Sequence, residues 1–145
     1  MSLPEPEIGL VIRYSYLWKS EHERGNNEGV KDRPCAIVLS VSAGDIGTRV
    51  TVLPITHSPP QNAALALEIP FIVKRRLGLD SERSWIVLSE GNEFTWPGPD
   101  LRPLPGEDLS SIVYGFLPPR LFSEILKRFI TLAKTGVVSA VPRTE

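Results

Sequence analysis

Proline and glycine interrupt this chain so often that it favours many short elements joined by turns. The 145 residues include 14 prolines and 11 glycines. Proline removes a backbone donor from strands and helices, and glycine adopts the backbone conformations that tight turns require. The pattern therefore predicts a small β-barrel or sandwich and disfavours a helical bundle.

Length and composition predict one ordinary globular domain, residues 1–145, with 41% hydrophobic and 23% charged residues. No apolar run approaches the length of a membrane span. The first residues, MSLPEPEIG, are acidic where a signal peptide is basic and then apolar. The single cysteine excludes an internal disulfide framework. We therefore expect a cytoplasmic protein that has no membrane partner.

The charges are nearly balanced, with 16 basic and 17 acidic residues and a net charge of −1. This is not the balance of a protein that coats nucleic acid non-specifically. A polyanion would therefore have to bind a local basic patch. The candidates are Lys31 with Arg33, and the run Lys74, Arg75 and Arg76, for which a solvated face is the alternative.

Residues 31–40, KDRPCAIVLS, combine surface charge with a buried strand. A short apolar run behind a proline is typical of a strand buried on both faces, with Pro34 as its first residue. Arg33 would then lie at the surface, held by rigid backbone. Such a guanidinium suits phosphate or carboxylate recognition, and a surface ion pair is the alternative.

The next strand is expected to bring distant residues back to Arg33. Residues 42–47, SAGDIG, have the composition of a turn, and residues 49–55 are typical of a third strand. Two strands joined in this way pair as an antiparallel hairpin, so Thr56 and His57 should emerge near Arg33. Both can face one site only if the strand has ended, which the two prolines that follow favour.

The remaining elements follow from the same patterns. We expect strands at residues 8–18, 64–69, 84–89 and 112–117, a polar loop at 19–32, a helical turn or loop at 70–78, and an irregular proline-rich segment at 92–105. Pro119 begins a helix with an apolar stripe, and Gly136 ends it. The expected organisation is a barrel at about 8–117, a helix at about 119–135 and a loose tail at 137–145.

The order of several short segments resembles the MazF/PemK family of bacterial toxin endoribonucleases, over roughly residues 8–132. The segments are Ile8-Gly9 with Ile12, Arg33-Pro34 with its apolar strand, Pro54-Ile55-Thr56, Gly78-Leu79-Asp80, Ser84, Glu90, and Gly115-Phe116-Leu117 before the helix. No single segment is specific, but their order and spacing together are.

The resemblance implies a mainly β fold with a C-terminal helix, the SH3-like β-barrel of the MazF/PemK/CcdB type, usually in a homodimer. It also implies metal-independent cleavage of single-stranded RNA to a 2′,3′-cyclic phosphate, without a cofactor, and an antitoxin that blocks the RNA groove. By resemblance, Arg33 matches the catalytic arginine and Thr56 the catalytic threonine. Glu21 and His22 fall in the substrate loop, and Glu90 falls near an acidic position that some members use.

Metal-free RNA cleavage needs a base for the 2′-OH, positive charge for the phosphorane and an acid for the leaving oxygen. Arg33 can supply the charge, and Thr56 can bond a non-bridging oxygen. His57 or His22 can transfer protons, and His57 is preferred because it adjoins Thr56, with Glu21 as the fallback base. The residues expected to contact RNA are His22, Lys31, Glu90, Lys74, Arg75 and Arg76.

A non-catalytic binding module is the alternative function. An SH3-like barrel could keep the scaffold and bind a protein or peptide through the same groove. Arg33 would then be structural, and Trp18, Phe94 and Trp96 would form the contact surface.

Overall fold

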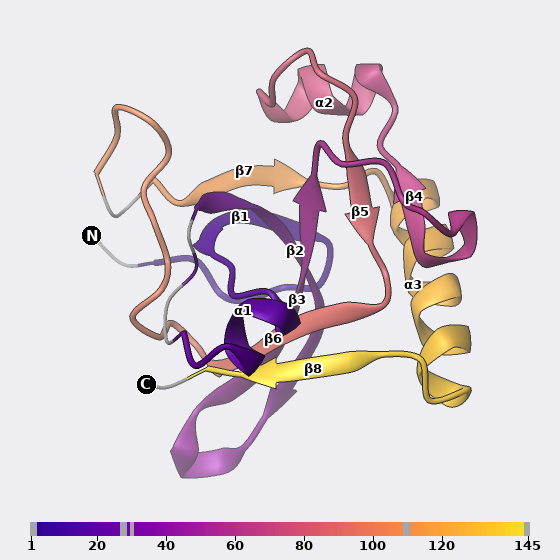
Figure 1. Cartoon of the computed structure of the whole chain (residues 1–145). Coiled ribbons are helices and arrows are strands. Elements are labelled where there is room, and N and C mark those ends of the chain that lie inside the picture. Colours follow the sequence, from indigo (N-terminus) through magenta and orange to yellow (C-terminus); the bar gives the residue numbers. More distant parts are fainter. Residues whose placement is uncertain (1–2, 27–28, 30, 109–110, 144–145) are drawn as a thin grey trace.

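The computed structural model describes residues 3–26, 29, 31–108 and 111–143, and it shows a mainly β protein with a C-terminal helix (Figure 1). In chain order the elements are β1 Leu10–Ser15, α1 Lys19–Glu23, β2 Asp32–Ser42, a 3₁₀ turn Gly44–Ile46, β3 Thr48–Thr56, a 3₁₀ turn Ala63–Leu65, β4 Ala66–Glu68, α2 Phe71–Leu77, β5 Trp85–Val87, β6 Glu90–Thr95, β7 Val113–Phe116, α3 Pro119–Lys134 and β8 Ser139–Pro142. None of the described helices is long and apolar enough to cross a membrane.

The strands form one eight-stranded sheet in the order β4-β5-β3-β2-β1-β7, with β6 paired to both β3 and β8. The β6–β8 pairing is parallel, and the other strand pairings are antiparallel. Among the described residues no pairing joins β4 to β7. The sheet is therefore open, and the closed barrel expected from the sequence is not formed.

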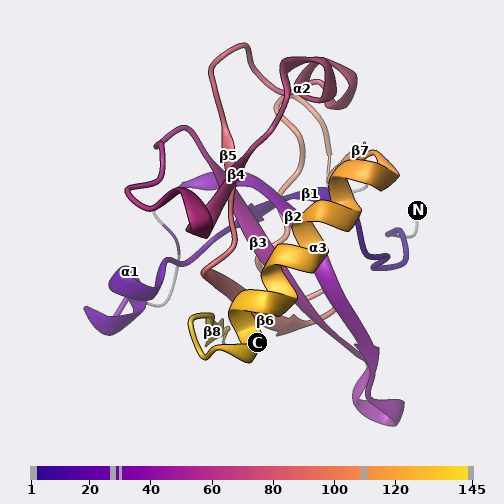
Figure 2. The same ribbon diagram turned by 90° about the vertical axis from the view of Figure 1, so that its right-hand side faces the viewer.

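The strand behind Pro34 is buried on both faces, as predicted. Ala36 and Val38 belong to one hydrophobic cluster, and Cys35 and Ile37 belong to a second. Because neighbouring strand residues point to opposite faces, the two clusters lie on the two sides of the sheet. Helix α3 covers the first side and packs Ile125 and Phe129 against it (Figure 2).

The predicted hairpin is confirmed. Strands β2 and β3 pair antiparallel from Cys35 opposite Pro54 to Ser42 opposite Thr48, and a 3₁₀ turn joins them. The turn end of the hairpin projects away from the rest of the molecule (Figure 2). The other end, where β2 begins and β3 ends, lies at the rim of the sheet beside α2.

Helix α3 and the segment at residues 70–78 also agree with the sequence. Proline occupies the first turn of α3, and Gly136 follows its end with a φ of 75°. Residues 71–77 form the helix α2, which was one of the two alternatives. Gly78 ends α2 in the left-handed conformation, which glycine adopts without steric cost.

Three expectations are wrong. The polar loop contains the short helix α1, and the segment expected to be irregular begins with β6, whose Phe94 stacks on Tyr14 at 4.8 Å. The tail is not loose, because β8 pairs with β6 and Arg143 is buried at 3.2 Å from Asp100. Strands β6 and β8 form because partners distant in sequence supply their pairing. Residues 144–145 lie outside the described residues.

Candidate active site

A cavity of about 430 Å³ opens at the rim of the sheet, where β2 begins and β3 ends. Its wall includes five of the ten site residues predicted from the sequence. These are Lys31, Arg33, Thr56, His57 and Lys74, joined by Arg13 and Tyr114. The cavity is therefore the candidate site.

The hairpin register places Arg33 and Thr56 at this rim. The β2–β3 pairing ends with Cys35 opposite Pro54, and Arg33 and Thr56 lie two residues beyond this pair, on the side of the rim. Residues two apart on a strand share a face, so both side chains leave the sheet on the same side. Strand β3 ends at Thr56, which allows His57 to line the same cavity.

The Arg33 guanidinium is held by an aromatic ring. Its central carbon lies 5.0 Å from the centroid of the Trp18 ring. Its Nε atom is buried and has no hydrogen-bond partner among the described residues. A ring face holds a cation without using its hydrogen-bond donors, and a planar guanidinium matches two oxygens of a phosphate.

The Thr56 hydroxyl is oriented by the turn that follows it. Its Oγ1 accepts a hydrogen bond of 3.2 Å from the backbone N–H of Ser58. A hydroxyl has one proton to donate in addition to its acceptor sites. With one acceptor site occupied, the Thr56 O–H can donate to an oxygen in the cavity.

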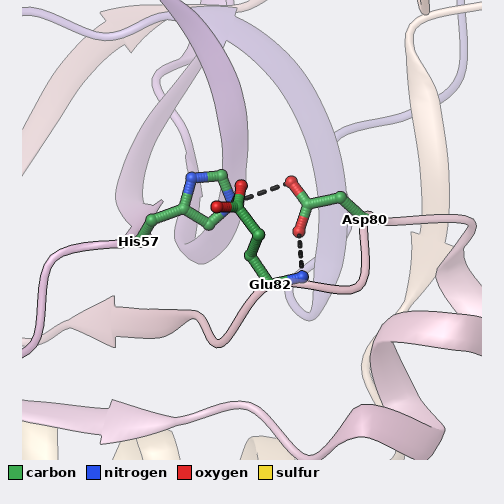
Figure 3. Close-up of side chains that lie close together, drawn as sticks. All are labelled: His57, Asp80 and Glu82. Carbon is green, nitrogen blue, oxygen red and sulfur yellow. Dashed lines mark hydrogen bonds and ion pairs between the residues drawn. The ribbon is translucent and has the colours of Figure 1, made fainter.

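His57 is paired with the loop between α2 and β5. Its Nε2 lies 2.7 Å from Asp80 Oδ2 and 3.6 Å from Glu82 Oε2, and the three side chains converge (Figure 3). The Nδ1 atom of His57 has no hydrogen-bond partner among the described residues. One nitrogen of the imidazole is therefore fixed by carboxylates and the other is available.

A buried lysine fixes the loop that carries these carboxylates. The Lys74 side chain is only 2% exposed, and its Nζ donates to Asp80 Oδ1 at 2.7 Å, to Ser84 Oγ at 2.6 Å and to the Glu82 carbonyl. Partial burial raises the pKa of Asp80, but the hydrogen bonds from Lys74 and His57 outweigh it and leave that pKa below its usual value. Asp80 is therefore ionised at neutral pH.

The cavity has an excess of positive charge. Asp80 compensates Lys74, and Asp32 lies 3.6 Å from Arg102. The other cations of the wall, Arg13, Lys31 and Arg33, have no acidic partner among the described residues. A concave surface with unpaired charge of one sign concentrates ligands of the opposite sign.

Five of the predicted site residues do not line this cavity. Glu21 is buried in α1, and its Oε1 accepts from the backbone N–H of Trp18 at 3.0 Å, so it caps its own helix. Glu90 accepts from the Tyr16 hydroxyl and the Lys19 backbone, each at 2.9 Å. The other three residues, His22, Arg75 and Arg76, are exposed on α1 and α2.

Sequence reasoning missed four residues near the cavity, namely Arg13, Tyr114, Asp80 and Glu82. The Arg13 guanidinium is 3.5 Å from the Tyr114 hydroxyl across the β1–β7 pair. An arginine within an apolar first strand was a usable signal, because such a charge must reach solvent or a partner. The loop of Asp80 gave no local signal, since its position depends on buried Lys74.

The three side chains that meet at His57 could also hold a metal ion. One donor atom from each of His57, Asp80 and Glu82 lies within 4.8 Å of the other two. Imidazole and carboxylate are ligands that first-row transition metals accept.

No family model matches the sequence, and a search of the curated proteins finds no relative.

Proposed function

We propose that this chain is a metal-independent endoribonuclease of the MazF/PemK kind, which cleaves single-stranded RNA by attack of the 2′-OH. As the resemblance implies, it would be the toxin of a toxin–antitoxin pair, act in the cytoplasm as a homodimer, and be blocked by its antitoxin. The scaffold would be an open, SH3-like variant of the family's fold, since its sheet is mainly antiparallel and carries a C-terminal helix.

The observation that carries the proposal is that Arg33 and Thr56 line one cavity, together with Arg13 and Lys31, for which the described part of the chain offers no acidic partner. These two residues lie far apart in the sequence, and the fold brings both to the wall of one cavity. A guanidinium and a hydroxyl donor at one phosphate supply the electrostatic stabilisation that phosphoryl transfer without a metal requires.

Each residue has a separate role in this proposal. Arg33 binds the non-bridging oxygens and stabilises the pentacoordinate phosphorane. Thr56 donates its hydroxyl proton to one of these oxygens. His57 transfers a proton through the available Nδ1, because Asp80 and Glu82 face its Nε2.

The test is cleavage of a mixed-sequence single-stranded RNA in EDTA by the parent, Arg33→Ala and Arg120→Ala. Arg120 is an exposed arginine on α3 that does not line the cavity, and it serves as the matched control. We expect the parent and Arg120→Ala to leave 2′,3′-cyclic phosphate ends, and Arg33→Ala to be about 10²–10³-fold slower. The absence of cleavage by the folded parent, or full activity of Arg33→Ala, would overturn the proposal.

The binding module remains the second candidate, on a different surface from the one expected. Phe94 is buried, and Trp96 is half-buried with its Nε1 donating to the Pro4 carbonyl at 3.1 Å, so the two residues offer little free aromatic surface. The projecting hairpin instead exposes Leu39, Val41 and Ile46. Exposed apolar side chains of this kind are typical of protein contacts. A chain that binds a protein through them without cutting RNA would favour this function.

A further inference from the structure

The side chains of His57, Asp80 and Glu82 form a donor set that the proposed RNA chemistry does not use as a unit (Figure 3). The imidazole comes from the end of β3, and the two carboxylates come from the loop between α2 and β5. The Nε2 atom of His57 is 2.7 Å from Asp80 Oδ2 and 3.6 Å from Glu82 Oε2. One nitrogen and two oxygens from separate parts of the chain therefore face the same point.

These separations suit a transition-metal ion. Ligand atoms bound to tetrahedral zinc at about 2.0–2.2 Å lie roughly 3.3–3.6 Å apart. The His57–Glu82 separation already meets this value, and a small rotation of the Asp80 carboxylate would open its contact to the same distance. The mixed imidazole and carboxylate set favours zinc over magnesium or calcium, which prefer oxygen ligands alone.

The carboxylates are held on a fixed loop, although all three ligands are exposed. Lys74 is buried and binds Asp80 Oδ1, the Glu82 carbonyl and the Ser84 hydroxyl, while Asp80 Oδ2 stays turned towards His57. An outer partner that fixes a ligand in this way raises metal affinity, commonly by 10- to 100-fold. The Lys74 ammonium also compensates the negative charge of Asp80, so we expect the three ligands to bind a metal ion with moderate affinity.

We propose that His57, Asp80 and Glu82 bind one Zn²⁺ ion per chain, and that the bound ion inhibits the chemistry of the adjacent cavity. Binding needs only the three side chains. The inhibition rests on the proposed function, because zinc would fix the ring of His57 and place a cation beside the phosphate site. No bond is made or broken in this step, apart from the metal–ligand bonds and loss of the proton between His57 and Asp80.

The test is calorimetric titration of the tag-free full-length chain with zinc chloride. The chain has two histidines, so His22→Ala on α1 is a matched control for His57→Ala. We expect one ion per parent chain, unchanged binding by His22→Ala, and at least about tenfold weaker binding by His57→Ala and by Glu82→Gln. Because both mutated side chains are exposed, we expect each variant to keep the parent's circular dichroism and unfolding midpoint.

The proposed metal site would be overturned if the parent is not saturated at 100 μM zinc, or if the parent and His57→Ala bind zinc equally well. RNA cleavage is measured in parallel, with zinc and then with excess EDTA. Cleavage by the parent that zinc leaves unchanged would overturn the inhibition. A parent that never cuts RNA but binds zinc through His57 would refute the proposed nuclease and leave the metal site standing.

Discussion

The guanidinium of Arg33 rests on the indole of Trp18, with 5.0 Å between its central carbon and the ring centroid. Trp18 is itself fixed through the residue before it. The backbone N–H and C=O of Leu17 are both bonded to the buried side chain of Asn92, at 2.8 and 2.7 Å. The position of the candidate catalytic arginine therefore depends on an amide in β6 that does not reach the cavity.

Replacing Trp18 by leucine should weaken RNA cleavage without abolishing it. The ring contributes a cation–π contact worth about 0.5–2 kcal/mol, and 1.4 kcal/mol corresponds to a factor of ten. We therefore expect Trp18→Leu to cleave about tenfold more slowly than the parent, and Arg33→Ala to be slower still. Initial rates on one single-stranded RNA measure the difference, and a Trp18→Leu rate equal to that of the parent would show that the ring does not position the guanidinium.

Asn92 and Arg143 should be coupled in stability. Arg143 donates to Asn92 Oδ1 at 3.0 Å and to the Ser15 carbonyl at 2.6 Å, and both side chains are buried. Asn92→Leu leaves the two backbone groups of Leu17 unpaired, so we expect the free energy of unfolding to fall by at least about 2 kcal/mol. The free energy of unfolding in urea is measured for a variant at Asn92, a variant at Arg143 and the double variant. The coupling energy between the two side chains should be about 0.5–3 kcal/mol.

The control for this cycle is Gln61→Ala, because Gln61 is an exposed amide on the surface. Its unfolding free energy should stay within about 0.5 kcal/mol of the parent value. Additive losses in the Asn92 and Arg143 variants would show that the two side chains act independently.

Asp80 should make the stability of the protein depend on acid pH. Burial raises its pKa, but Lys74 and His57 lower it further, so the folded chain holds Asp80 more strongly ionised than the unfolded chain does. Its contribution is therefore complete above the unfolded pKa of about 3.9, and it is lost as the pH falls through the lower folded value. The unfolding free energy of the parent minus that of Asp80→Asn, measured from pH 2 to 7, should decrease towards acid pH.

The exposed Glu124→Gln variant on α3 is the comparison for this experiment, since Glu124 forms an i,i+4 surface pair with Arg128. A difference between the parent and Asp80→Asn that is constant over the whole pH range would contradict the assignment of the low pKa to Asp80.

The parts of the fold that local patterns determine could be predicted from the sequence. The hairpin of β2 and β3 follows from two apolar runs around a glycine-containing turn, and it correctly brings Thr56 and His57 to Arg33. Helix α3 follows from its proline and its apolar stripe. These features involve residues that are close in sequence, or one short turn apart.

The predictions that failed depend on contacts that leave no pattern in the sequence. Strand β6 contains two glutamates and a glycine, and its backbone pairs with β3 and β8 in spite of that composition. Glu21 looked like a free carboxylate, but it caps the N-terminus of its own helix α1. Asp80 joins the site only because Lys74, six residues earlier, is buried beneath its loop. None of these contacts leaves a periodic signal.

Cys35, the only cysteine of the chain, should be unreactive until the protein unfolds. It is fully buried in β2, and burial raises the pKa of its thiol, while the charges of Arg33 and Arg143 offset only part of that effect. The reactive thiolate is therefore scarce, and a reagent reaches the sulfur only when the core strand opens. We expect Ellman's reagent to modify one thiol per chain in urea, and to react with the native protein at least about a hundredfold more slowly.

The control is the double variant Cys35→Ala with Ser42→Cys, which moves the thiol to an exposed position of the same hairpin. This thiol should react rapidly in the native state. Equal native rates for the two thiols would mean that β2 opens readily, and a strand that opens so readily could not hold Arg33 at the cavity with the precision that RNA cleavage requires.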